Sequence, residues 1–204
     1  MYKAKDFGIL TILVILVSFG VSLTLKAAVG VGAWDALAQS GSFLTGVQVG
    51  TVGMVLNISC IFGQLLVMKK DFDLKRLLQL PISILLGVLV NYFFYTVLAP
   101  FEFNNYIMRL IIFTLALSIV AFAVGAVMVL DIVTFPVEGF CMVLANKLPV
   151  KFGLLRQLVD IISIIVVVVL TYVFSIPLTL GVGTFIGMFI FGPMMGFFIE
   201  RTTP

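Results

Sequence analysis

Six long apolar stretches constrain the fold of this chain more than any other feature. They cover 7–25, 49–68, 79–98, 107–130, 153–175 and 178–199. A helix needs about 20 residues to cross the hydrocarbon core of a bilayer, so each stretch is long enough to span it. The composition agrees, because only 10% of the residues are charged, whereas soluble domains carry about 25%. The sequence therefore predicts an all-α, polytopic membrane helix bundle that forms one membrane domain over 1–204.

Basic residues at the ends of these stretches predict how the chain is oriented. Lys and Arg concentrate in cytoplasmic loops, so the side on which most of them lie is expected to be the cytoplasm. A cytoplasmic location is expected for Lys3, Lys5, Lys69, Lys70, Lys75, Arg76, Lys147, Lys151 and Arg201. Only Lys26 and Arg109 then remain at outer ends. We expect six spans with both termini in the cytoplasm. The basic residues thus indicate the topology of the chain and do not form a patch for binding nucleic acid. The predicted partner is the lipid bilayer, and no nucleic-acid partner is expected.

Two shorter segments, 32–45 and 136–147, are below the comfortable length of a membrane span. The first contains the only tryptophan, Trp34, followed by Asp35, and the second begins at Pro136. A helix of 14 residues rises only about 21 Å, which reaches into the membrane without crossing it. We favour two re-entrant helices that enter from opposite sides. Amphipathic helices lying flat at the interfaces, or short full spans, are the alternatives.

The two short segments are related by an offset of 103 residues, which brings Asp35 onto Glu138. The same offset matches Val47 with Val150, Gly50 with Gly153, and Asn57 with Asp160. The rare polar and glycine positions coincide, which apolar segments alone do not produce. Repeat one would cover about 1–100 and repeat two about 105–204, with three spans each, so the second repeat would be inverted. Inverted repeats with interrupted helices are typical of transporters, whose site lies at the repeat interface.

These motifs resemble the YczE/YyaS/YitT family of bacterial integral membrane proteins. The resemblance rests on Gly-Val-Gly-Ala-Trp-Asp-Ala-Leu at 30–37 and Leu-Thr-Gly-Val-Gln-Val-Gly-Thr at 44–51. Pro136-Val137-Glu138-Gly139, Gly181-Val182-Gly183-Thr184 and Gly192-Pro193 resemble later elements of that family. Where the family has an Arg and an Asp, this chain has Val137 and Glu138, so a ligand bound by that Arg would differ or be absent here. The resemblance implies that the protein lies in a bacterial cytoplasmic membrane and contains the internal repeat. It implies no particular activity, because that family has no settled one.

Polar residues inside the apolar segments are the candidates for a functional site. Ionisable groups at bilayer depth are expensive and mark ligand or ion pathways. The predicted binding residues are Trp34, Asp35, Gln39, Asn57, Glu138, Arg156 and Asp160. Each also has a structural interpretation. Asp35 and Glu138 could cap the starts of their helices, and Arg156 could pair with Asp160 one helical turn away instead of anchoring an anion.

Catalysis is not expected. The chain contains no histidine, which removes the commonest metal ligand and the usual catalytic base. No phosphate-binding loop and no nucleophile–base arrangement is present, and the two cysteines stand in apolar surroundings. We therefore predict no enzyme activity, no catalytic residues, no metal site and no cofactor.

The sequence favours a small-solute transporter or permease with a pseudo-symmetric midplane site. A substrate-capture subunit of an ATP-driven uptake complex and a non-transporting membrane accessory protein are the alternatives. The solute could be an acidic or zwitterionic metabolite held by Arg156, and a coupled cation held by the acids is an equal hypothesis. Gly183 and Gly187 favour packing inside the monomer, with a homodimer as the alternative. A transport-complex partner would accompany the capture function.

Overall fold

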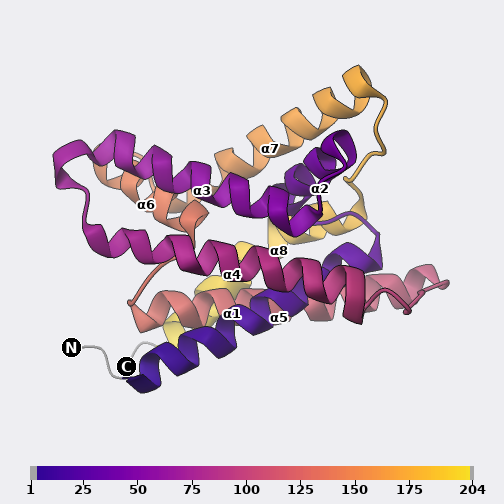
Figure 1. Ribbon diagram of the computed structural model, residues 1–204, viewed down its shortest axis with the longest axis horizontal. Coiled ribbons are helices and arrows are strands. Elements are labelled where there is room, and N and C mark those ends of the chain that lie inside the picture. The colour runs from indigo at the N-terminus through magenta and orange to yellow at the C-terminus, as the bar shows by residue number, and fades with distance from the viewer. Residues whose placement is uncertain (1–3, 203–204) are drawn as a thin grey trace.

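The computed structural model describes residues 4–202, except for the side chains of 4, 193 and 196–202. Within that range the chain forms eight α-helices and no strand, which confirms the predicted all-α helix bundle (Figure 1). The helices are α1 (Ala4–Ala27), α2 (Ala33–Thr45), α3 (Val49–Met68), α4 (Gln79–Tyr92), α5 (Tyr106–Leu130), α6 (Pro136–Lys147), α7 (Phe152–Phe174) and α8 (Val182–Thr202). Two 3₁₀ turns (Lys69–Asp71, Leu74–Leu78) join α3 to α4, and a π-helical turn (Phe93–Val97) ends α4.

Five segments are long and apolar enough to cross a membrane, and they match the first five predicted spans. They are Lys5–Ala27, Val49–Asp71, Leu74–Val97, Tyr106–Leu130 and Phe152–Phe174. The sixth predicted span, 178–199, corresponds to α8, whose apolar part among the described side chains is Val182–Gly192. The side chains of 196–199 lie outside the described residues. The chain is a multi-pass membrane protein.

The predicted start of the sixth span, at 178, is wrong. Helix α8 begins at Val182, because the preceding residues form an extended connection from α7. Ser175 has a left-handed φ of 53° that ends α7, and Pro177 cannot donate a helical hydrogen bond. The Thr179 hydroxyl then donates to the Ala36 carbonyl at 3.1 Å, which ties this connection to α2.

The two short helices have the predicted bounds to within a residue. Pro136 occupies the first position of α6, where its fixed φ suits a helix start and no N–H is needed. Helix α2 ends at Gly46, whose φ of 71° is the left-handed conformation that glycine adopts without strain. In Figure 1, α2 lies toward one end of the bundle and α6 toward the other, where α1 begins and α8 ends.

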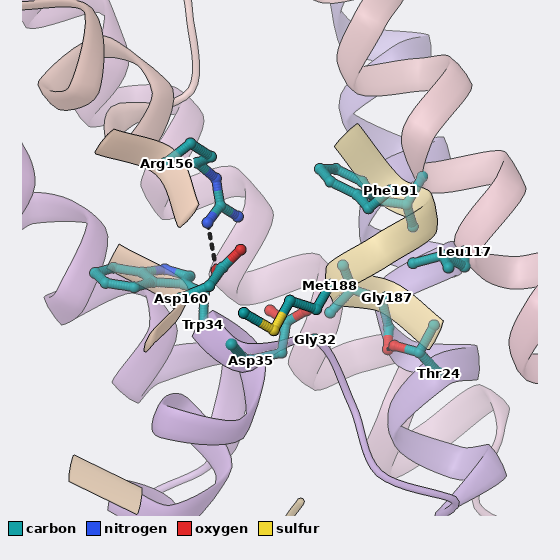
Figure 2. A pocket seen from close by; sticks show the side chains of 13 residues that line it. Thr24, Gly32, Trp34, Asp35, Leu117, Arg156, Asp160, Gly187, Met188 and Phe191 are labelled. Carbon is teal, nitrogen blue, oxygen red and sulfur yellow. Dashed lines mark hydrogen bonds and ion pairs between the residues drawn. The ribbon is translucent and has the colours of Figure 1, made fainter. Parts of the chain in front are cut away.

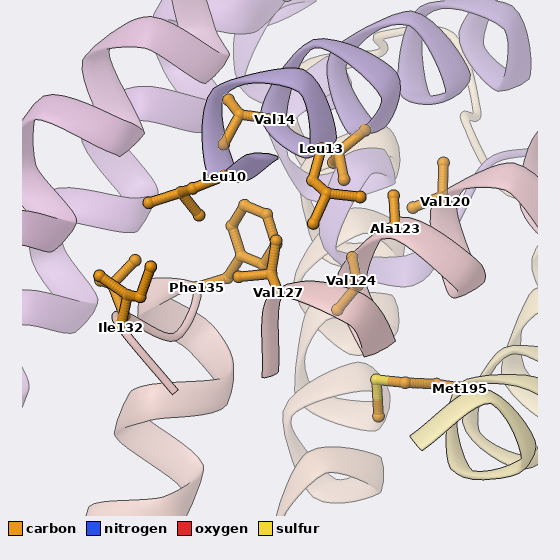
Figure 3. Close-up of a cluster of buried hydrophobic side chains, with 12 residues drawn as sticks. Leu10, Leu13, Val14, Val120, Ala123, Val124, Val127, Ile132, Phe135 and Met195 are labelled. Atoms are coloured by element: carbon orange, nitrogen blue, oxygen red, sulfur yellow. The ribbon is translucent and has the colours of Figure 1, made fainter. Parts of the chain in front are cut away.

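Helix α5 packs extensively against both α1 and α8. Apolar side chains from α1 and α5 interdigitate with Phe135 and Met195 in the largest buried cluster (Figure 3). Lipid tails are as apolar as these side chains, so close packing rather than exclusion of water holds these helices together. Gly183 of α8 lies against Gly30 and Phe113, and a Cβ on Gly187 would lie 3.9 Å from the Gly32 Cα. Both glycines therefore pack within the chain.

Packing of the short helices is reciprocal between the two halves. Helix α2 packs against α3 and α7, and α6 packs against α7 and α3. The long helix pairs α3–α4 and α7–α8 differ between the halves, however. Helices α3 and α4 approach closely at Gly50 and Gly87, where a Cβ on Gly50 would overlap the Gly87 carbonyl oxygen. Helices α7 and α8 have little contact with each other, so a gap remains beside α7.

Candidate functional site

Arg156 is shared by two carboxylates from two different helices. Its Nη1 donates to Asp160 Oδ1 one turn further along α7, and its Nε lies 3.4 Å from Glu138 Oε1 on α6. The side chains of Arg156 and Asp160 are each 18% exposed and that of Glu138 only 8%. The intrahelical pair expected as an alternative is therefore present, and Glu138 extends it into a triad.

Helix α2 brings two further predicted residues to the same place. The Trp34 indole Nε1 donates to Asn57 Oδ1 at 3.3 Å, which joins α2 to α3. Asp35 is the third residue of α2, and its Oδ2 would lie 3.4 Å from a Cβ on Gly32. Among the described residues, the Asp35 carboxylate makes no hydrogen bond and no ion pair. The helix-capping role considered for Asp35 therefore involves no side-chain hydrogen bond.

Two adjoining cavities connect these residues. The first, about 80 Å³, is lined by Trp34, Asp35, Arg156 and Asp160, with α8 on the opposite side (Figure 2). The second, about 120 Å³, shares Trp34, Asp35 and Arg156 with the first and adds Asn57 and Glu138. Six of the seven predicted binding residues thus line one or both of these two cavities.

Gln39 is the exception, because it lines neither cavity. The next turn of α2 presents Ala38 to the second cavity. Gln39 points away from that lining, because successive residues of a helix are rotated by about 100° from one another. Ser40, the residue after Gln39, is the buried polar residue of α2. Its hydroxyl oxygen lies 3.0 Å from the hydroxyl oxygen of Thr179. Gln39 was predicted as a binding residue, and the structure does not place it at either cavity.

A larger hollow continues from the ion pairs into the gap between α7 and α8. It measures about 550 Å³ and shares Arg156, Asp160 and Gly187 with the first cavity. Gly187 and Gly192 of α8 leave this side open, because neither carries a side chain. The charged residues of α7 can therefore be reached laterally between the two helices.

A buried amide network that sequence reasoning missed holds the start of α6. Gln64 and Gln79 are almost completely buried, and Gln64 Nε2 donates to Gln79 Oε1 at 2.8 Å and to the Pro136 carbonyl at 3.1 Å. Arg76 Nη1 donates to Gln64 Oε1 at 2.9 Å. The available signal was a glutamine late in α3 and another at the start of α4, since buried amides require partners. Two residues after Pro136 stands Glu138, so this network sets its position.

Both short helices point their N-terminal ends at the site. Asp35 and Glu138 lie in the first turns of α2 and α6, where the positive end of the helix dipole favours a carboxylate. The arrangement combines carboxylates, one guanidinium, an indole and an amide around a space of small-molecule size. It can bind a small charged or polar ligand through ion pairs and hydrogen bonds.

The sequence of residues 4–200 matches a family described as a family of unknown function (DUF6198). The chain belongs to this family. The match includes both short helices and every residue of the cavities. No curated protein and no solved structure matches the chain.

Proposed function

We propose that this member of the DUF6198 family is a small-solute transporter of the bacterial cytoplasmic membrane, with its site between two inverted halves. The observation that carries the proposal is the position of the charged cluster. Asp35, Glu138, Arg156 and Asp160 line cavities at which two short helices from opposite ends of the bundle converge. Broken helices whose N-termini point at a site between repeats are the pattern of secondary transporters.

The reciprocal packing supports an inverted repeat. Helix α2 of the first half lies on α7 of the second, and α6 of the second half lies on α3 of the first. This exchange is what a two-fold relation between 1–100 and 105–204 would produce. The matched pair Asn57 and Asp160 then lies beside the matched pair Asp35 and Glu138. Kinship with the YczE/YyaS/YitT-type proteins is part of the same proposal.

The proposed orientation places both termini in the cytoplasm. Helix α6 then enters from the cytoplasmic side and α2 from the outside. The α3–α4 hairpin carries Lys69, Lys70, Lys75 and Arg76, and Lys147 ends α6 with its Nζ 3.5 Å from Asp71 Oδ2 of that hairpin. This basic end of the bundle suits a cytoplasmic location.

Transport requires that the cavities open alternately to the two sides, and single-cysteine labelling tests this. Cys60 and Cys141 are free and buried, so Cys60→Ala and Cys141→Ala provide the background. Ala38→Cys on α2 and Val137→Cys on α6 place probes in the second cavity. Each should react with a membrane-impermeant maleimide from both sides of oriented vesicles.

The controls are Val47→Cys, expected to react only from outside, and Lys70→Cys, expected to react only from the cytoplasmic side. Both positions are exposed and lie outside the cavities. Cavity cysteines that react from one side only would overturn the transport proposal. A stoichiometric ATPase that copurifies with the chain would instead favour a substrate-capture subunit.

A further inference from the structure

Arg156 is already neutralised by protein side chains, which bears on the charge of any ligand. Arg156 donates through Nη1 to Asp160 and through Nε to Glu138, so these two carboxylates offset its charge even though three of its five N–H groups are not used in these contacts. An anionic ligand would have to compete with two carboxylates that are held in place by their helices. The geometry thus disfavours Arg156 as the binding group for an acid.

The remaining charge around the cavities is negative. Asp35, Glu138 and Asp160 carry three negative charges against the single positive charge of Arg156. The N-terminal ends of α2 and α6 each add roughly half a positive charge. The sum leaves about one negative charge uncompensated, in a space enclosed largely by apolar side chains. Such a site is completed by one monovalent cation.

Comparison of the two halves places that cation beside Asp35. The offset of 103 residues that matches Glu138 with Asp35 also matches Arg156 with Gly53. Glu138 therefore has a guanidinium partner, whereas the position that would supply one for Asp35 carries no side chain. Gly53 lines the 120 Å³ cavity together with Asp35, and a Cβ built on it would meet nothing closer than the Ala38 Cβ at 3.8 Å. At the position where the second half carries Arg156, the first half therefore has open space beside Asp35, and Arg156 itself also lines this cavity.

We propose that the solute of this transporter is a small organic cation with an ammonium group, which binds in the cavity between Asp35 and Gly53. This inference rests on the proposed function and names its ligand class. A protein cavity of roughly 150 Å³ holds a benzene-sized molecule, so a space of about 120 Å³ suits a short alkylammonium ion. The ammonium pairs with Asp35, the alkyl part contacts the apolar lining, and Trp34 supplies an aromatic ring at the same cavity.

Trp34 makes the proposal directly measurable. It is the only tryptophan and it lines the cavity, so the fluorescence of the purified chain in lipid vesicles reports on the site. The probe is n-butylammonium chloride, compared with sodium butyrate and sodium chloride at equal ionic strength. We expect a saturable fluorescence change with butylammonium alone. A saturable response to butyrate, or an equal response to sodium chloride, would overturn the organic-cation class.

Asp35→Asn should weaken butylammonium binding by roughly tenfold or more, because a charge-assisted contact is lost. Asp71→Asn is the matched control, since Asp71 is an exposed acid outside the cavities. Unchanged affinity in Asp35→Asn would overturn the assignment to Asp35.

A tethered cation provides a second test that does not depend on an added ligand. Gly53→Lys should place an ammonium opposite Asp35, abolish the butylammonium response and raise the melting temperature relative to Gly53→Met. The advantage of Lys over Met should vanish in an Asp35→Asn background, as a double-mutant cycle measures. Equal melting temperatures of the Lys and Met variants in the Asp35 chain would overturn the proposal.

The two proposals fail separately. Cavity cysteines that alternate in access without butylammonium binding would leave transport standing and remove the cation. Saturable butylammonium binding with access from one side only would leave the cation site standing and remove transport.

Discussion

The Arg156 guanidinium lies 3.4 Å from the Glu138 carboxylate, although the two residues stand on different helices and a turn region separates them. This pair joins the short helix α6 to the spanning helix α7 at the point where the cavities begin. Asp160 completes the triad from one turn away. The interaction therefore serves both the stability of α6 and the charge of the site.

Replacing Arg156 by Gln should destabilise the protein strongly. Glu138 and Asp160 would keep their charges without a partner, and breaking a buried pair in this way costs about 3–5 kcal/mol. Thermal unfolding of the purified variant, followed by size-exclusion chromatography, measures the loss. Lys147→Gln is the control, because it breaks the exposed pair with Asp71, worth about 1 kcal/mol or less. Equal melting temperatures for the two variants would contradict the prediction.

The amide network at the start of α6 predicts non-additive mutations. Gln64→Leu should cost about 1–3 kcal/mol, because it leaves the Gln79 amide and the Arg76 guanidinium short of partners. Adding Gln79→Leu should cost less than the two single effects together, since the second change removes an orphaned group. Gln39→Leu should change the melting temperature little, because the Gln39 side chain makes no hydrogen bond to the residues that the structure describes. Additive effects of the first two changes would show that the amides act independently.

Two glycines of the second half should respond oppositely to alanine. A Cβ on Gly139 would lie 2.8 Å from Gln79 Nε2 and 3.0 Å from Thr134 Oγ1, so Gly139→Ala should cost about 1–3 kcal/mol through overpacking. A Cβ on Gly153 would meet nothing within 4 Å. Gly153→Ala should therefore be neutral, or stabilise α7 by up to about 1 kcal/mol through helix propensity. Melting temperatures of the two variants that shift in the same direction would contradict this geometry.

Two threonine hydroxyls, Thr179 beside α2 and Thr171 on α7, offer a matched pair. The Thr179 hydroxyl contacts the Ser40 hydroxyl and donates to the Ala36 carbonyl, so Thr179→Val should destabilise by about 1–3 kcal/mol. Thr171 Oγ1 is buried and has no hydrogen-bond partner among the residues that the structure describes. Thr171→Val removes that unpaired hydroxyl and should leave the melting temperature unchanged or raise it. Loss of stability in Thr171→Val equal to that in Thr179→Val would show that Thr171 has a partner of its own.

Much of the fold follows from local sequence. Apolar stretches of spanning length predicted α1, α3, α4, α5 and α7 because backbone groups in lipid must be satisfied within a helix. Pro136 and Gly46 marked ends of the short helices because their backbone preferences are intrinsic. The start of α8 was mispredicted because apolar residues continue through 178–181, where the contacts of Thr179 with α2 override the hydropathy pattern.

For the candidate site, the sequence indicated most of the residues but not how they are arranged. Rare polar residues at membrane depth pointed to Asp35, Glu138, Arg156 and Asp160, since burial of charge there is costly whatever the fold. Gln39 satisfied the same argument and yet lies outside the cavities, because the face of α2 that lines the second cavity carries Ala38 instead. Gln79 was missed because a glutamine at the end of a span is common in membrane helices. Its role depends on the hydrogen bond with the Gln64 amide, which only the tertiary structure shows.

By itself, the sequence determined the all-α membrane class, the five long apolar spans that include α1, α3, α4, α5 and α7, and the two short segments. These follow from hydropathy and backbone chemistry that act within a single segment. Only the tertiary structure decided that Glu138 shares Arg156 with Asp160, that Asp35 faces a cavity at Gly53, and that α7 and α8 stand apart. Those relations depend on how helices are rotated and placed against each other, which interhelical packing sets and no single segment encodes.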